Sequence, residues 1–206
     1  MKKIILLFYL ITIPIFAQKE YTYNFKNSDS LDSYIQKNNL VFHPEDIYIT
    51  KDFESFKAYT ETELFRSPII YVFNQDGKYL ESIDNLTSEK KLSNFNKIKS
   101  KPDKDQPNLD FWIEKITHYK SNEILEHSDS SYTYTFLINW DIINSEQKQI
   151  IVDILNEWYS VLLRQKAVGK NIKIILLNID IQDYWGLSPE WREYVLENVN
   201  RSWNKK

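Results

Sequence analysis

The stretch that decides the fold is residues 136–155, FLINWDIINSEQKQIIVDIL. It starts as a mostly apolar run that ends at Trp140, a pattern typical of a buried strand. The polar residues from Asn144 to Gln147 follow as a turn, and the apolar residues beyond them recur at helical spacing. The sequence therefore predicts a buried strand that passes through a short turn into a long amphipathic helix over residues 145–167.

Strand-like and helix-like patterns also alternate along the rest of the chain. Short apolar runs bounded by turn residues indicate strands, and segments with apolar residues at helical spacing indicate helices. An Asp76-Gly77 turn between two apolar runs is the signal of a β-hairpin. Together these patterns predict an α/β fold in which a mixed β-sheet is flanked by helices. The expected strands are residues 21–25, 46–50, 132–140, 171–181 and both arms of a hairpin within 67–83, and the expected helices follow caps at Ser30 and Asp52, begin at Ser88, Ser145 and Pro189, and span 109–119.

The N-terminal segment has the layout of a secretory signal peptide. Lys2 and Lys3 precede an apolar run, and Ala17 stands just before polar sequence. The apolar run is shorter and more abruptly ended than the roughly 20 residues that a membrane span needs. We therefore expect residues 1–17 to be cleaved and the protein to be exported, to the periplasm or beyond the cell, with no stable membrane span afterwards. A retained N-terminal anchor is the alternative.

One linker-like stretch divides the remaining chain. Residues 99–108, KSKPDKDQPN, combine two prolines with alternating charge and have no strand or helix pattern. We therefore expect a first α/β half at residues 18–98, which contains the hairpin, and a second α/β half at residues 109–206. The pattern leaves open whether the two halves share one sheet.

The composition excludes several kinds of chemistry. The net charge is −3 and the lysines are interspersed with acidic residues, which argues against nucleic acid as the main partner. Without cysteine, the chain can form no disulfide, thiol nucleophile or thiolate metal site. Its three glycines fall at expected turns and helix ends, so they build no phosphate-binding loop. We therefore expect no cofactor and no nucleic-acid partner.

The second half resembles the thioredoxin-like superfamily, particularly its secreted disulfide reductases of the cytochrome-maturation type. In those proteins a buried strand ends in a Trp-containing turn, a Cys-x-x-Cys pair opens a long helix, and the next strand ends in Asp. The matching stretches are YTFLINWD at 134–141, the helix from Ser145, IKIILLNID at 172–180 and SPEWREYVLENV at 188–199. The resemblance implies a thioredoxin-like sheet.

The remaining elements of such a fold occur earlier in the chain than the resemblance implies. The family continues with a strand introduced by a cis-proline, a hairpin with an Asp-Gly turn, and a final helix. This pattern is similar to SPIIYVFNQDGKYLESIDNLTSEKKL at 67–92, where Pro68 stands at the position of the cis-proline. The chain is therefore either one thioredoxin-like domain in permuted order or two incomplete halves that share a sheet. An unrelated α/β sandwich is the remaining alternative.

The reaction of the resembling family is excluded, because no cysteine can exchange disulfides here. Polar residues occupy the start of the expected helix instead, and we expect Asn144 and Gln147 to cap it. We therefore expect a redox-inactive, non-enzymatic protein that binds a protein or peptide partner in the exported compartment. Since substrates of the family dock beside the cis-proline, the resemblance implies a contact surface that comprises Trp140, Asp141, Asn144, Ser145 and Pro68.

An enzymatic alternative rests on acidic residues near the strand ends. Asp141 follows one expected strand and Asp180 ends the next, so both are expected at the carboxyl edge of the sheet, where α/β proteins bind ligands. The alternative is an exported hydrolase or metal-dependent enzyme that uses this cluster, with His118 as a third member. His118 also shares an expected helical face with Asp110 and Glu114. Such faces are usually solvated ion-pair stripes, so we predict no metal site.

Overall fold

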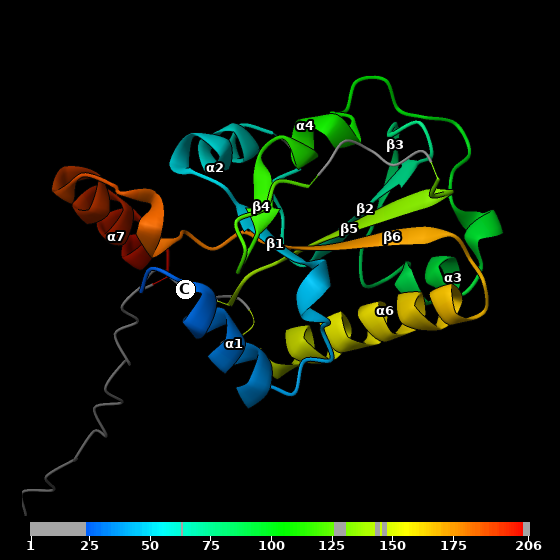
Figure 1. Ribbon diagram of the computed structural model, residues 1–206, viewed down its shortest axis with the longest axis horizontal. Coiled ribbons are helices and arrows are strands. Elements are labelled where there is room, and N and C mark those ends of the chain that lie inside the picture. The colour runs from blue at the N-terminus through cyan, green and yellow to red at the C-terminus, as the bar shows by residue number, and fades with distance from the viewer. Residues whose placement is uncertain (1–23, 63, 126–130, 143–144, 146–147, 204–206) are drawn as a thin grey trace, which may run out of the picture. The chain divides into compact units, whose positions relative to one another are not determined.

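The structure of the protein is a computed structural model (Figure 1). The chain divides into one compact unit of residues 25–187 and a second unit that contains residues 188–203. The expected signal peptide lies outside the described residues. No helix in the described part of the chain is both long and apolar enough to cross a bilayer. The described residues are 24–62, 64–125, 131–142, 145 and 148–203.

The larger unit is built on a single mixed β-sheet with the order β3-β2-β5-β6-β1-β4. Strands β5, β6 and β1 are mutually parallel, whereas β2, β3 and β4 each run antiparallel to a neighbour. Strands from both sides of residues 99–108 pair with one another, so one sheet joins the two halves of the chain. The predicted α/β class with a mixed sheet is confirmed. The strands are β1 Ile47–Thr50, β2 Ile69–Asn74, β3 Tyr79–Ile83, β4 Ile116–His118, β5 Tyr134–Trp140 and β6 Ile172–Asn178.

Strand β5 has sheet neighbours on both sides and helices over both faces. Leu137 lies opposite Tyr71 of β2 and opposite Ile175 of β6. All its residues from Thr135 to Trp140 are buried. A strand covered on both faces favours a nearly continuous apolar run, which is what the sequence of β5 shows.

Helices cover both faces of the sheet (Figure 1). On one face, α6 packs through an apolar stripe that includes Val152, Leu155 and Trp158, with α1 and α3 beside it. On the other face, Tyr59 of α2 and Trp112 of α4 belong to a second core. The sheet therefore has a hydrophobic core on each side. The helices of this unit are α1 Ser28–Lys37, α2 Phe53–Thr60, α3 Ser88–Leu92, α4 Leu109–Ile113 and α6 Gln149–Ala167.

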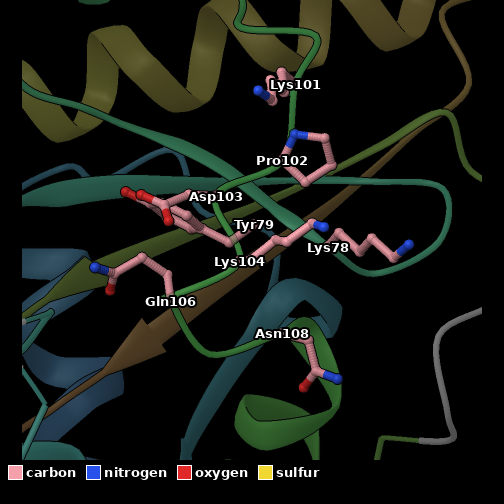
Figure 2. A pocket seen from close by; sticks show the side chains of 8 residues that line it. All are labelled: Lys78, Tyr79, Lys101, Pro102, Asp103, Lys104, Gln106 and Asn108. Atoms are coloured by element: carbon pink, nitrogen blue, oxygen red, sulfur yellow. The ribbon is translucent and has the colours of Figure 1, made fainter.

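The hairpin forms where the sequence predicts it. Strands β2 and β3 pair antiparallel, and Gly77 has a φ of 70°, the left-handed conformation that an Asp-Gly turn needs. The segment 99–108 follows this hairpin (Figure 2). The amide of Asp103 donates a hydrogen bond to the carbonyl of Tyr79 at 2.9 Å. The amide of Leu109 donates to the carbonyl of Gly77 at 2.7 Å. These bonds attach the segment to the edge strand of the sheet.

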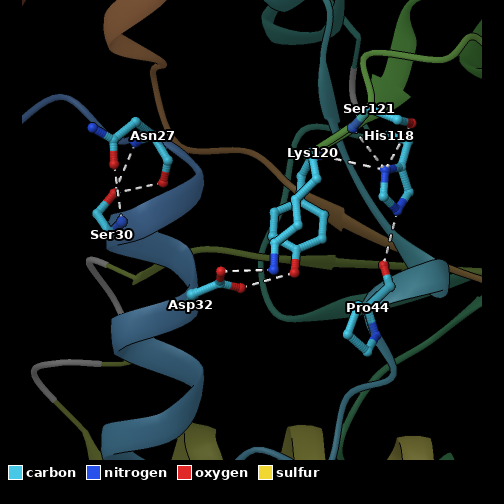
Figure 3. Close-up of polar contacts among 8 residues, drawn as sticks. Asn27, Ser30, Asp32, Pro44, His118, Lys120 and Ser121 are labelled. Carbon is cyan, nitrogen blue, oxygen red and sulfur yellow. Dashed lines mark hydrogen bonds and ion pairs between the residues drawn. The ribbon is translucent and has the colours of Figure 1, made fainter.

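Two expected helix caps have different outcomes. Asp52 caps α2 as predicted, and its carboxylate accepts a hydrogen bond from the amide of Ser55 at 2.7 Å. The expected cap of α1 at Ser30 is wrong, because Asn27 caps this helix. Asn27 Oδ1 accepts from the Ser30 amide at 2.9 Å and the Ser30 hydroxyl accepts from the Asn27 amide at 2.8 Å, a reciprocal capping box (Figure 3). The N-cap therefore lies three residues earlier than the prediction.

The expected helix over residues 109–119 is wrong beyond Ile113, where α4 ends. Residues 116–118 instead form β4 and pair with the edge of β1. The β-branched side chains of Ile116 and Thr117 suit a strand, and pairing supplies hydrogen-bond partners for the edge of β1. The helix that begins at Ser88 is short and ends at Leu92.

The long helix also starts later than the prediction. It begins at Gln149, and Lys148 occupies the N-cap position without a side-chain cap hydrogen bond. The expected start at Ser145 is therefore wrong. The predicted capping by Asn144 and Gln147 concerns residues that lie outside the described residues.

The predictions for the two ends of the chain have different outcomes. Helix α7, Pro189–Trp203, begins at the predicted proline, and Ser188 Oγ accepts from the amide of Trp191 at 3.3 Å. Of the expected strand at 21–25, residues 24 and 25 lie outside any strand and the others lie outside the described residues.

A buried ion pair on β3 yields a stability prediction. Glu81 is almost fully buried; its carboxylate pairs with the ammonium group of Lys91 on α3 and accepts from the amide of Lys99 at 2.9 Å. Glu81→Ala leaves both donors without this acceptor, and we expect it to lower the free energy of unfolding by about 2 kcal/mol in urea titrations at pH 7. The matched control Glu89→Ala, at an exposed position of α3, is expected to change it by less than about 0.5 kcal/mol. Equal stability of the two variants would contradict this role.

Candidate functional site

The candidate site lies at the carboxyl ends of β5 and β6, the edge at which parallel α/β sheets bind ligands. Trp140 ends β5, and its carbonyl accepts a hydrogen bond from the amide of Ile179 at 2.9 Å. The two strands run parallel, so Asp141 and Asp180 leave the sheet at the same edge. Strand geometry therefore brings together two residues that the sequence predicts as neighbours.

Trp140 is a core residue and does not form part of the exposed rim. Its side chain is fully buried. The indole stacks on Tyr34 with a ring-centroid distance of 6.4 Å and meets the edge of Phe42 at 5.4 Å. This position joins α1 to the sheet, and the indole has no surface with which to contact a partner.

Asp180 holds the turn that follows β5. Its Oδ2 atom accepts from the amide of Ile142 and from the side-chain amide of Asn178, each at 2.8 Å. Gln182 adds a donor to the same network, because its Nε2 atom donates to the carbonyl of Asp180 at 2.7 Å. Asn178, Asp180 and Gln182 are all buried. This polar network fixes the chain after Asp141 against the end of β6.

The electrostatics of the pair Asp141 and Asp180 follow from burial. The side chains are 5% and 2% exposed. Burial, together with the negative charge of Asp141, raises the pKa of Asp180 to about 7, although its hydrogen bonds from Ile142 and Asn178 act in the opposite direction. Asp180 is therefore able to hold a proton near neutral pH, but its burial keeps that proton away from solvent.

The other predicted site residues have separate outcomes. Ser145 is buried, and its hydroxyl donates to the carbonyl of Asp141, whereas Asn144 lies outside the described residues. Pro68 is half-buried at the start of β2, and the peptide bond between Ser67 and Pro68 is cis. The side-chain amide of Asn139 on β5 donates to the carbonyl of Arg66 at 3.2 Å. This bond ties the segment before Pro68 to the central strand.

His118 does not join Asp141 and Asp180. It lies on β4, at the far side of β1 from β6, and pairs with Tyr48 of β1. Its Nε2 atom contacts the carbonyl of Pro44 at 3.1 Å, and its Nδ1 atom accepts from the amide of Ser121 at 3.2 Å (Figure 3). Both ring nitrogens are thus engaged with local backbone. The helical face that would have aligned His118 with Glu114 does not form, because α4 ends at Ile113.

The network is better suited to holding structure than to performing chemistry. Asn178 and Gln182 direct their side-chain amides at Asp180, which in turn accepts from the amide of Ile142, although Asp180 Oδ1 and Gln182 Oε1 have no hydrogen-bond partner in the described part of the chain. No group of three His, Cys, Asp or Glu residues that could hold a metal occurs among the described residues. Because Asp141 and Asp180 are buried, a substrate has no open route to either carboxylate through the described residues.

Sequence reasoning missed a groove that adjoins Pro68. It has a volume of about 180 Å³ and combines segments that are far apart in the chain. The sequence does place a basic residue, Arg66, just before Ser67-Pro68. The residues of β3 and of segment 99–108 that complete the groove are brought beside it only by the tertiary structure. The groove is lined by Leu64, Arg66, Ile69, Tyr71, Ser82 and Gln106.

Comparison of the chain with protein-family models, with curated proteins and with solved structures finds no match in any of the three.

The raised pKa of Asp180 predicts the pH dependence of stability. Its folded-state pKa of about 7 exceeds the unfolded value of about 4, so the folded state binds the extra proton and loses stability as pH rises between these values. Asp180→Asn removes the charge and keeps an acceptor for Ile142. We expect the free energy of unfolding to fall less steeply from pH 5 to pH 8 in this variant than in the wild type.

Urea titrations at pH 5, 6, 7 and 8 measure this difference. Asp105→Asn, at an exposed position, is the matched control and should keep the wild-type slope. A wild-type slope in Asp180→Asn would show that Asp180 is charged at neutral pH in the folded state.

Proposed function

We propose that the chain is an exported, redox-inactive protein of thioredoxin-like architecture that binds an extended segment of another exported protein. The observation that carries this proposal is the position of β2 directly beside β5 in a chain without cysteine. The strand introduced by Pro68 and the strand that leads to the long helix are neighbours, as the resemblance requires. Residues 1–17, with the layout of a signal peptide, support export.

The order of the strands supports the permuted arrangement over two incomplete halves that share a sheet. Strand β5 lies between β6, which follows the long helix α6, and β2, which begins the hairpin. The hairpin precedes β5 in the chain, whereas in the resembling family it follows. A single sheet with both cores shared fits either arrangement, but the hairpin beside β5 completes one set of elements around this strand, which favours the permuted order.

The turn after β5 supports a role in binding instead of redox chemistry. A thiolate at such a position would need cysteine, and the chain has none. The turn is held instead by the buried carboxylate of Asp180 through the amide of Ile142. What the described residues retain is a fixed start of the connection, at Asp141 and Ile142, and a hydrogen bond from Asn139 of β5 to the segment before Pro68.

The accessible part of the predicted contact surface is the groove beside Pro68. Trp140, Asp141 and Ser145 are buried, so Pro68 is the accessible member of the set among the described residues. The surface that the groove exposes is more polar than apolar, because Ile69 and Tyr71 are buried, and the exposed Arg66 places a cation at its rim. These features suit an extended peptide with polar side chains and an acidic group.

An enzymatic role has one observation in its favour. The pKa of Asp180 is raised to about 7, the range in which a general acid works at neutral pH. Burial of Asp180 and Asp141, and the separate position of His118, give this pair no access to substrate among the described residues. Binding is therefore the function that the geometry supports better.

Site-specific photo-crosslinking in the exported fraction tests the proposal. We expect a benzophenone amino acid at Arg66 or Gln106, on the groove, to yield one discrete adduct that mass spectrometry identifies as the same partner from both positions. The control positions Lys57 and Lys170 are exposed on helix α2 and beyond α6 and should yield no such adduct. Adducts of equal yield from all four positions, or none from the groove, would contradict the proposed surface.

A further inference from the structure

A larger pocket lies at the turn end of the hairpin (Figure 2). Its volume is about 520 Å³, within the range typical of small-molecule sites. The hairpin contributes Lys78 and Tyr79, and the segment that follows η2 (Phe95–Lys97) contributes the other side chains. The pocket is lined by Lys78, Tyr79, Lys101, Pro102, Asp103, Lys104, Gln106 and Asn108.

The walls of this pocket are fixed by hydrogen bonds. The amide of Asp103 donates to the carbonyl of Tyr79 at 2.9 Å, and Asp103 Oδ1 accepts from the amide of Asp105 at 3.1 Å. Tyr79 is buried in the core beside Tyr71 and Phe73. A ligand that enters the pocket therefore meets a preformed surface, and its binding costs little conformational entropy in the protein.

The charge of the lining is positive. Lys78, Lys101 and Lys104 are all exposed, and in the described part of the chain none of them has an acidic group within ion-pair distance. Asp103 is the single acidic residue in the lining. The three lysines lie at different places on the lining, and the side chain of Lys101 points away from those of Lys78 and Lys104 (Figure 2). Together they give the pocket a positive potential that attracts an anion. This concentration of lysines contrasts with the net charge of −3 of the whole chain.

The lining also has apolar parts. The ring of Pro102, the aromatic ring of Tyr79 and the aliphatic stems of the lysines present carbon surface, and the amides of Gln106 and Asn108 add polar groups. Asn108 Oδ1 is engaged as the cap of α4, where it accepts from the amide of Phe111 at 3.1 Å. Such a mixture suits a ligand with an apolar body and a charged head.

From these observations we propose that the pocket binds a small organic anion, with a carboxylate, sulfonate or phosphate group attached to an aromatic or other apolar body. The positive potential of Lys78, Lys101 and Lys104 attracts the anionic head, and Tyr79 and Pro102 contact the body. The inference goes beyond the proposed function and does not rest on it, because the lysines that carry it do not line the groove beside Pro68, although Gln106 lines both.

Fluorescence titration with two matched probes tests the site. The anionic probe is 8-anilinonaphthalene-1-sulfonate, and N-phenyl-1-naphthylamine has the same aromatic body without the sulfonate. We expect saturable binding of the sulfonate at one site, weakened by about tenfold, or about 1.4 kcal/mol, in the triple variant Lys78→Gln, Lys101→Gln, Lys104→Gln. The neutral probe is expected to bind the wild type and the triple variant alike.

A triple variant of equal net charge separates a local effect from a general one. Lys57→Gln, Lys90→Gln, Lys170→Gln removes three exposed lysines outside the pocket and should bind the sulfonate as the wild type does. Urea titration checks that both triple variants fold. Equal sulfonate affinity in the two triple variants, or no saturable binding to the wild type, would overturn the proposal. Crosslinking from Arg66 is expected to be unchanged in the variant that lacks Lys78, Lys101 and Lys104. Either proposal can therefore be contradicted without contradicting the other.

Discussion

The structure depends on the pairing of β5 with strands from two distant parts of the chain. On one side β5 pairs parallel with β6, and on the other it pairs antiparallel with β2. Phe136 and Ile138 enter the core under α6, and Leu137 enters the core under α2 and α4. A single buried strand thus joins both cores, and the positions of the Pro68 segment and of the turn at Asp141 follow from its register.

The carboxyl end of β5 is held by polar groups in a buried environment. Burial of a carboxylate is unfavourable unless it is hydrogen-bonded or protonated, and Asp180 has two donors together with a raised pKa. The same bonds keep Ile142 against β6. This arrangement holds the start of the connection after β5, Asp141 and Ile142, in a chain without cysteine. Among the described residues, the neighbouring groove and the lysine-lined pocket are open to ligands.

The sequence predicts those elements whose signals are local. The apolar run of β5, the Asp76-Gly77 turn and the cap at Asp52 depend on a few neighbouring residues, and all three are confirmed. The end of α4 at Ile113 was missed because pairing with the edge of β1 outweighs a helical pattern. The burial of Trp140 was missed because α1 covers it from a distant part of the chain. The groove beside Pro68 and the lysine-lined pocket were missed for the same reason, because tertiary contacts bring their walls together.

The central claim is that segments on both sides of residues 99–108 share one sheet, in which Asn74 of β2 lies opposite Tyr134 of β5. Cross-strand partners have Cα atoms about 4.5 to 5.5 Å apart, which permits a disulfide. Oxidation of Asn74→Cys, Tyr134→Cys, followed by mass spectrometry of the monomer, tests the claim. We expect an intramolecular disulfide in this variant and none in the control Asn74→Cys, Lys57→Cys. Free thiols, or only intermolecular links, in the first variant would contradict it.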